Sequence, residues 1–522
     1  MIPSDAGTSR RTYDAHPLPS RSPGQDRAKD PGPDGQAPQR TYHHPSVQDL
    51  LPQEPNTCKI AAARHVIGEK LHDTGWRDDV THRELQDINH EVRQLSPAER
   101  NETVAGLSDA QLKTWAGEVR SGGVLGSGGL EADERQALLE DLAAGLDGKQ
   151  LARLSRAFDD RLASDELGDA IAAHAGHGAK VEFVKQLAGE VEGDSRAAVQ
   201  VAKAIGGLRG DAASVDAALG AHDKQQLATV ITAGLQKSNS NDNGIFSQSG
   251  SHTFVTYNAE PLRALLDAAA TGNDATLKAD VFQLAATELK ALSQVQGVHG
   301  GSTVVMSKGE VTELTKSLSH LITSDTNGVM KELERNDPYG RGLSSFSEQM
   351  IRHGHFDEMK VILLQLKTGN DGTEDQVKRF TAVGVDSEGN GQHFNNAEVL
   401  GYFVGSVQAG ASAINRDADK QASTMKALLA GSLSAGKDIR GAWISDKVGK
   451  ALLGTGVAVV GTASVLAIDA WNRQAKAATT DWRESFKEMA RPQGADGRNY
   501  NGPAPEADFD AAISRVADAA AP

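Results

Sequence analysis

The chain has 522 residues, a formal net charge of −16 and an aromatic content of only 4%. This length accommodates roughly three or four domains of about 150 residues each. The acidic balance and the absence of long Lys/Arg runs argue against nucleic-acid binding, because phosphate contacts need clustered basic residues. Abundant Ala and Gly favour closely packed helices over a β-sandwich. The single cysteine, Cys58, excludes an internal disulfide and indicates folding in a reducing compartment.

The first part of the chain, residues 1–57, is predicted to be a disordered leader. Ten of the 17 prolines lie within residues 1–55, and this stretch has no periodic apolar face. The first 20 residues lack the apolar segment of a cleaved secretory signal. We therefore expect a protein that is made in the bacterial cytoplasm and exported, if at all, by a machine that reads a disordered leader.

Helix-start signals open the region of residues 58–240. Thr81 with Glu84 is a capping box, and Ser96 is followed by Pro97 and Glu99. A capping residue that precedes Gln-Leu by three positions then recurs at Ser108, Asp147 and Asp223. In each case an apolar residue follows on the expected buried face, at Trp115, Leu154 and Val230. The pattern predicts a degenerate helical-hairpin repeat, with chance caps in an all-helical protein as the alternative.

Two stretches interrupt the helical pattern and divide the chain. Residues 241–257 predict a hairpin or a long loop, and residues 295–305 predict a loop with a short strand. The Gly-rich stretch at 121–129 lacks the ending of a phosphate loop and is expected to connect helices. The predicted fold is all-α, a multi-helix array of helical hairpins. Its helical domains span 58–240, 258–370 and 371–490, and a flexible tail over 491–522 contains a short helix around Phe509, Ile513 and Val516.

A loop between two predicted helices resembles a calcium-binding EF-hand loop. Asp386, Glu388 and Asn390 occupy its first, third and fifth positions, and Gly391 occupies the sixth. The closing carboxylate, Glu398, stands one place later than such a loop requires. The alternative is a polar turn that joins two helices without a metal. Calcium is the only cofactor that the sequence suggests.

Histidines and catalytic motifs give weaker signals. His353, His355 and Asp357 lie within five residues, as do His174 and His177 in a Gly/Ala-rich loop. Zinc sites normally draw their ligands from separated elements, so helix-start roles are the preferred interpretation. No local nucleophile or metalloprotease motif is present. We therefore lean against an enzyme, although a scattered active site stays open.

The stretch Ala451–Ile468 contains 18 residues without a charge, close to the length that crosses a bilayer core. Trp443 and Trp471 bracket it as interfacial aromatics would. The small residues that recur every four positions would permit close helix approach, and they are Gly454, Ala458 and Thr462. The interpretations are a buried core helix or a helix that leaves a soluble form and inserts.

Three runs of the chain resemble helical modules of uncharacterised proteobacterial secreted effectors and polymorphic toxins. They are LSPAERNETVAGLSDAQLKTWAGEV, DGKQLARLSRAF and AEVLGYFVGSVQAGASAI. The resemblance implies delivery into a host or competitor cell, with type III secretion as one route. It implies protein partners such as a host target, a secretion chaperone or an immunity protein. It carries over no catalytic residue.

These observations predict a secreted, virulence-related effector or toxin-like protein. In this reading a helical scaffold presents a C-terminal region that reaches membranes. The first alternative is a helical adaptor that binds partner proteins, and the second is an enzyme with a scattered active site. The uncharged stretch Ala451–Ile468 favours the effector interpretation, whereas the repeated capped hairpins favour the adaptor.

Overall fold

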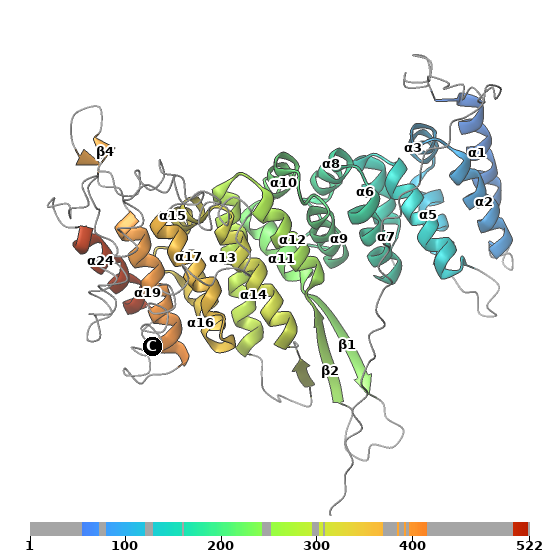
Figure 1. The fold of residues 1–522 in the computed structure, drawn as a ribbon. Helices are drawn as coiled ribbons and strands as arrows, with labels where there is room; N and C mark the ends of the chain where they lie inside the picture. Colours follow the sequence, from blue (N-terminus) through green and yellow to red (C-terminus); the bar gives the residue numbers. More distant parts are fainter. Residues whose placement is uncertain are drawn as a thin grey trace, which may run out of the picture. The chain divides into compact units, whose positions relative to one another are not determined.

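The computed structural model describes residues 55–71, 80–120, 129–158, 161–242, 252–294, 302–305, 308–368, 384–385, 391–392, 396–414 and 505–519. All of them belong to one compact unit, Pro55–Pro522. The described residues form 19 helices that pack in adjacent pairs, which confirms the all-α prediction (Figure 1). The predicted leader lies outside the described residues except for its last three positions.

The first half of the array contains helices of eight to 14 residues. Their bounds are α1 (Thr57–Lys70), α2 (His82–Gln94), α3 (Pro97–Ala105), α4 (Asp109–Arg120), α5 (Ala132–Gly145), α6 (Gly148–Ala157), α7 (Arg161–His174), α8 (His177–Leu187), α9 (Ser195–Gly206), α10 (Ala212–Leu219) and α11 (Lys224–Gly234).

The second half of the array continues in the same manner and includes longer helices. Their bounds are α12 (Glu260–Thr271), α13 (Ala275–Gln294), α14 (Lys308–Thr323), α15 (Thr326–Asn336), α16 (Arg341–His353), α17 (Phe356–Thr368), α19 (Asn396–Ile414) and α24 (Pro505–Ala519).

Contacts between alternate helices build a two-layer array. In one layer α3, α5, α7, α9, α11, α13 and α15 follow one another, and in the other α4, α6, α8, α10, α12 and α14 do so. This is the contact pattern of stacked helical hairpins, in which each hairpin covers the apolar face of its neighbour. The buried apolar side chains form one continuous cluster from Ile67 to Val516.

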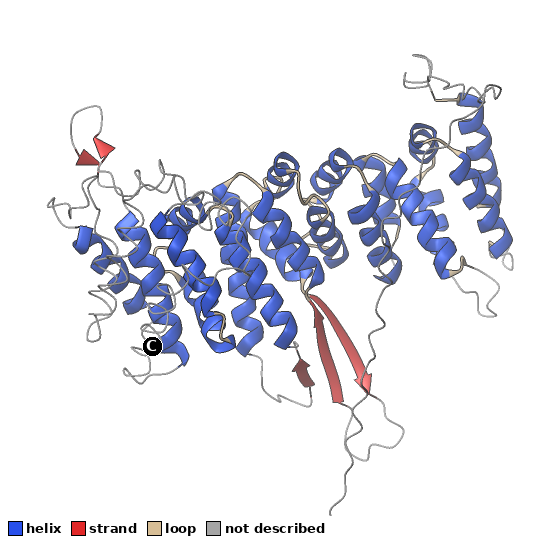
Figure 2. Cartoon of the chain, viewed as in Figure 1, coloured by secondary structure: helices blue, strands red, loops and turns tan. Residues whose placement is uncertain are grey.

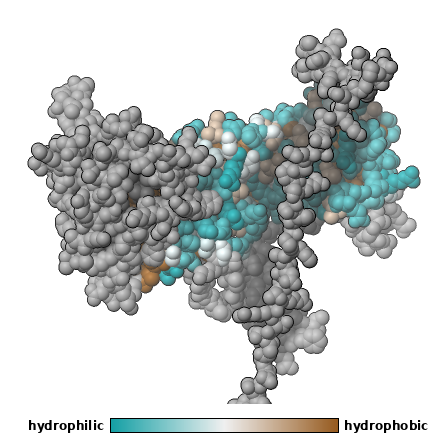
Figure 3. Space-filling model, viewed as in Figure 1, coloured by the Kyte–Doolittle hydropathy of each residue, from teal (hydrophilic) through white to brown (hydrophobic). Residues whose placement is uncertain are grey.

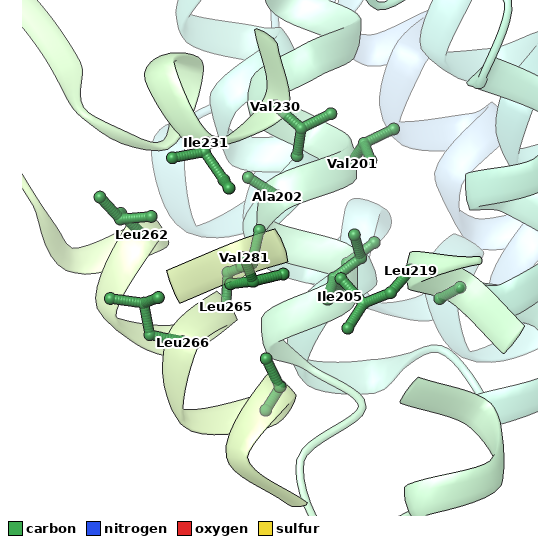
Figure 4. Close-up of a cluster of buried hydrophobic side chains, with 14 of the residues drawn as sticks. Val201, Ala202, Ile205, Leu219, Val230, Ile231, Leu262, Leu265, Leu266 and Val281 are labelled. Atoms are coloured by element: carbon green, nitrogen blue, oxygen red, sulfur yellow. The ribbon is translucent and has the colours of Figure 1, made fainter. Parts of the chain in front are cut away.

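The centre of this cluster lies where helices α9 to α13 meet. Figure 4 shows Val201 and Ile205 of α9 in one cluster of buried side chains with Leu265 of α12 and Val281 of α13. All four side chains are fully buried. The visible surface around the helices is mostly hydrophilic (Figure 3), as expected of hairpins whose apolar stripes face one another. Packing of these stripes, and not the caps alone, therefore holds neighbouring hairpins together.

The predicted helix caps are confirmed. Thr81 with Glu84 and Ser96 with Glu99 form complete capping boxes at α2 and α3. The recurrent caps also stand at helix starts: the backbone N–H groups of Gln111, Gln150 and Gln226 donate to Ser108, Asp147 and Asp223 over 3.2, 2.8 and 2.9 Å. Each bond satisfies an amide that the first helical turn leaves without a partner.

Buried basic side chains join one hairpin to the next. The guanidinium of Arg100 donates to the carbonyls of Val92 and Leu95, over 3.2 and 3.3 Å, and also to that of Asp141 in α5. The ammonium of Lys180 in α8 donates to the carbonyl of Gly207 over 2.8 Å. Carbonyls at a helix end lack helical partners, so a cation placed there satisfies them and the negative end of the helix dipole together.

Strands interrupt the array where the sequence predicted a break. β1 (Gln236–Asp242) and β2 (His252–Asn258) form an antiparallel hairpin between α11 and α12, in the register Gln236↔Asn258 (Figure 2). β3 (Ser302–Val305) adds to β2 in parallel, which gives the order β1-β2-β3. β4 (Gly384–Val385) and β5 (Gly391–Gln392) form a second, two-stranded pair. Helix packing nevertheless continues across the hairpin, because α11 contacts both α12 and α13.

The two predicted C-terminal helices are present and pack on each other. α19 buries Leu400, Phe403, Val404 and Val407, whereas Ile414 at its end is 36% exposed. The tail helix is α24, whose Ile513 and Val516 are buried. Its packing against α19 was not predicted, since the tail was expected to be flexible.

Candidate functional site

The proposed calcium ligands are only partly within the described residues. Asp386, Glu388 and Asn390 lie outside them, so the metal interpretation stays a prediction. Glu398 lies in the first turn of α19, where its Oε1 accepts a hydrogen bond from Nη1 of Arg515 over 3.3 Å. Glu398 is thus engaged by an arginine of α24.

Glu398 belongs to a charged cluster between α15, α19 and α24. Nη2 of Arg515 donates to Oε1 of Glu334 over 2.6 Å, and its Nε donates to the carbonyl of Pro338 over 3.0 Å. The Glu334 side chain is only 12% exposed. We call Glu334, Glu398 and Arg515 the carboxylate–arginine cluster. One guanidinium in it bridges carboxylates from two different helices.

Burial shifts the protonation of this cluster. It raises the pKa of Glu334 to about 7, helped by a hydrogen bond and charge repulsion from Glu398 and opposed by Arg515. Burial alone would lower the pKa of Arg515, but its bonds to the two carboxylates outweigh this and raise it. A carboxyl group that titrates near neutral pH marks a candidate functional site, although structural ion-pair clusters share the property.

A buried tyrosine, Tyr402, and a glycine in the left-handed region, Gly340, lie beside the cluster. The hydroxyl of Tyr402 donates to the carbonyl of Asp337 over 2.9 Å, and burial raises its pKa well above the usual value. Gly340 has a φ of +61°, which disfavours a side chain. A Cβ there would also lie 2.6 Å from Oγ of Ser406 and 3.0 Å from Cγ1 of Val516. The segment between α15 and α16 is therefore shaped to let α19 and α24 approach closely.

A second candidate site is a cleft of about 470 Å³ formed by α7, α9, α11 and the start of β1. Its lining residues are Ser164, Asp165, Ser195, Arg196, Val199, Thr232, Ala233, Leu235 and Gln236. Hydroxyl, carboxylate, guanidinium and amide groups thus border an apolar strip. Such a mixture can bind a peptide backbone and accommodate small apolar side chains, and the volume lies within the range of ligand pockets.

Hydrogen bonds fix the geometry of this cleft. Nε2 of Gln236 donates to Oδ1 of Asp165 over 2.9 Å, which ties the first residue of β1 to α7. Nζ of Lys203 in α9 donates to the carbonyl of Asp165 over 3.1 Å. Gln200 donates to both the carbonyl and the hydroxyl of Ser164 over 2.9 Å. The cleft walls are thus held in place before any ligand arrives.

The predicted membrane segment lies outside the described residues. This applies to Ala451, Gly454, Ala458, Thr462 and Ile468. It applies equally to the flanking Trp443 and Trp471. Among the helices that are described, none is both long and apolar enough to cross a bilayer. The insertion hypothesis therefore stays a prediction from sequence.

His174, His177 and His355 contact different carboxylates. His174 Nε2 lies 3.7 Å from Glu140, and His177 Nδ1 lies 3.0 Å from Asp211. The rings of His353 and His355 are 6.5 Å apart, and His355 Nδ1 lies 3.5 Å from Glu358. Within the described part of the chain, no three His, Cys, Asp or Glu side chains are grouped to hold a metal ion.

Sequence reasoning missed most of the residues that form the two sites. Glu334 and Arg515 are 181 positions apart, and each resembles an ordinary surface charge on an amphipathic helix. The cleft residues come from three helices and a strand, so no local motif could reveal them. The only local signal was Glu398, which was interpreted as a metal ligand. Comparison with protein-family models and with curated proteins finds no match to this chain.

Proposed function

We propose that this chain is a protein-binding helical scaffold whose cleft between α7, α9 and α11 receives an extended segment of a partner protein. The observation that supports it is the continuity of the cleft with an edge strand. Gln236 lines the cleft and is also the first residue of β1. Among the strands that the structure describes, β1 pairs with β2 alone, and no described strand lies on its other edge, which could accept a further strand.

The chemistry of the cleft favours an extended peptide over a small apolar ligand. Ser195 and Thr232 are exposed hydroxyls, and the side chains of Arg196 and Asp165 are each about one-third exposed, at 36% and 31%. The Thr232 hydroxyl already donates to the carbonyl of Ala228, so its oxygen can accept from a peptide N–H, and further peptide groups can bond to the backbone of β1. Strand addition gives affinity through main-chain bonds, and neighbouring pockets supply specificity. The proposal is compatible with delivery to another cell, which stays a prediction from sequence.

A peptide selection tests this function directly. Random 12-residue peptides displayed on phage would be selected on the full chain, and binders measured by fluorescence polarisation. Thr232→Arg should weaken binding about tenfold or more, because a long cation fills the cleft from an exposed position. Gln225→Arg is the matched control, since Gln225 is exposed on the same helix and does not line the cleft. Bound peptide should also slow amide exchange in β1.

Peptides that bind both variants as tightly as the wild type would refute the cleft as the binding site. If Thr232→Arg weakens peptide binding but bound peptide leaves amide exchange in β1 unchanged, the cleft is still the binding site. Strand addition to β1 would then be refuted.

A further inference from the structure

Asp165 has the least compensated charge among the residues that line the cleft. Its Oδ1 accepts a hydrogen bond from Nε2 of Gln236 over 2.9 Å and lies 3.5 Å from Nζ of Lys203. The same ammonium lies 2.8 Å from Oδ1 of Asp169, so one cation serves two carboxylates. Among the described residues, no hydrogen bond to Oδ2 of Asp165 is found. These three side chains therefore leave a net charge of −1 at the edge of the cleft.

The other charged side chain that lines the cleft already has a counter-ion. Nε and Nη2 of Arg196 donate to Oδ1 and Oδ2 of Asp194 over 3.2 and 3.1 Å. Two parallel bonds between a guanidinium and a carboxylate are stronger than a single neutral one. An acidic ligand would have to compete with Asp194 for Arg196, whereas a cation can approach Asp165 directly. The cleft therefore favours a positively charged group.

Gln236 sets the position of this carboxylate relative to β1. Its Oε1 accepts a hydrogen bond from Nδ2 of Asn258, its antiparallel partner in β2, over 3.2 Å. Its Nε2 donates to Asp165, so the amide is held from both sides. On a strand added to β1, the residue directly opposite Gln236 has its side chain on the same face, with the two Cβ atoms about 5 Å apart. A lysine or arginine at that position is long enough to reach Asp165.

We propose that the cleft selects an extended segment with a lysine or arginine opposite Gln236, and that Asp165 is the specificity-determining residue that binds this cation. This selectivity rests on the proposed function, because it requires strand addition beside the cleft. A charge-assisted bond to Asp165 should raise the affinity for such a segment about tenfold. Added salt should reduce this gain, because the Asp165 side chain is partly exposed.

Peptide libraries of fixed charge test the selectivity on the full chain. Three displayed libraries of 12-residue peptides would have Lys, Met or Glu at one central position and random residues elsewhere. The Lys library should give the tightest binders and the Glu library the weakest. In the best Lys peptide, replacement of this Lys by Met should weaken binding to the wild type about tenfold.

The variant Asp165→Asn assigns the effect to one residue. Asparagine keeps an oxygen that can accept from Gln236, so the Met peptide should bind this variant as it binds the wild type. The Lys peptide should lose its advantage over the Met peptide. Glu192→Gln is the matched control, because Glu192 is exposed, lies two residues before Asp194 and does not line the cleft. It removes the same charge and should leave the tenfold difference unchanged.

The position of the lysine provides a second measurement. Neighbouring residues of a strand point to opposite faces, so moving the Lys by one place along the best peptide should remove its advantage. An advantage that persists after this shift would refute the placement opposite Gln236.

The outcomes separate this selectivity from the proposed function. If Thr232→Arg abolishes binding but the Met or Glu library gives equal or tighter binders, the cleft is still the binding site and the selectivity for a cation is refuted. An equal loss from Lys to Met on Asp165→Asn and on the wild type would refute the role of Asp165. If none of the libraries gives a binder, the proposed function itself is refuted, and the selectivity with it.

Discussion

At the scale of single residues, buried charges in this protein are matched by groups on neighbouring helices. Burial lowers the pKa of Lys180 and of Lys278, because it disfavours the charged ammonium. Each ammonium nevertheless has an oxygen partner at hydrogen-bond distance, the carbonyl of Gly207 at 2.8 Å and the hydroxyl of Ser324 at 2.9 Å. Such bonds offset the cost of burial only while both partners are present.

Glu334 provides a prediction about pH. Its folded pKa of about 7 exceeds the ordinary value of 4.5, so between these values the folded state binds more protons than the unfolded state. Stability is therefore expected to fall as pH rises through this window, by at most about 3 kcal/mol from this group. Urea unfolding of the wild type and of Glu334→Gln at about pH 5 and about pH 8 measures the effect.

Glu334→Gln cannot ionise, so the variant should lose this part of the pH dependence and exceed the wild type in stability at about pH 8. An identical pH dependence in both proteins would contradict the assignment of the raised pKa to Glu334.

At the scale of elements, some helix caps also connect hairpins. Asp147 caps α6, and its Oδ2 accepts a further bond from Nδ2 of Asn101 in α3 over 2.9 Å. The backbone N–H of Asp147 donates back to Oδ1 of Asn101 over 2.9 Å. Within the described residues, Ser108 by contrast bonds inside its own helix start, to Gln111 and Leu112. The two caps share a sequence pattern but differ in tertiary role.

This difference can be measured with a double-mutant cycle. Asp147→Ala should cost about 2 kcal/mol, of which about 1 kcal/mol is the local cap and the rest the bond to Asn101. Combination with Asn101→Ala should reveal a coupling of about 1 kcal/mol. Ser108→Ala, the control, should cost about 1 kcal/mol and show no coupling to Asn101→Ala. Additive losses for Asn101 and Asp147 would show that the side-chain bond between them contributes nothing to stability, whereas the bond from the backbone N–H of Asp147 persists in Asp147→Ala.

At the scale of the whole molecule, each hairpin contacts mainly its immediate neighbours. α2 packs on α1 and α5, whereas α12 packs on α9, α10, α11, α13 and α14. Stability in such an array is approximately a sum of local terms and neighbour interfaces. A cavity near one end should then open only the helices around it.

Hydrogen exchange of two core variants measures this locality. Leu85→Ala in α2 and Leu265→Ala in α12 each remove a fully buried side chain, with an expected local loss of about 2 to 5 kcal/mol. Leu85→Ala should accelerate exchange in α1, α2 and α5 and leave α13 to α16 unchanged. Leu265→Ala should accelerate it on both sides of α12. A uniform increase along the chain for Leu85→Ala would indicate a single cooperative unit instead.

The sequence alone determined the fold class, the helix starts and the two breaks. These features depend on interactions within about four residues, such as the bond from Ser96 to Glu99, or on the periodic burial of one helix face. The helical tail around Ile513 and Val516 was predicted for the same reason.

Only the tertiary structure decided what each exposed or charged residue meets. Glu398 was expected to close a calcium loop, but in the folded chain it shares Arg515 with Glu334. Asp165 and Gln236 meet only because α7 and α11 flank α9. Contacts between residues tens or hundreds of positions apart depend on how helices stack, and helical periodicity carries no information about which charged face will lie against which.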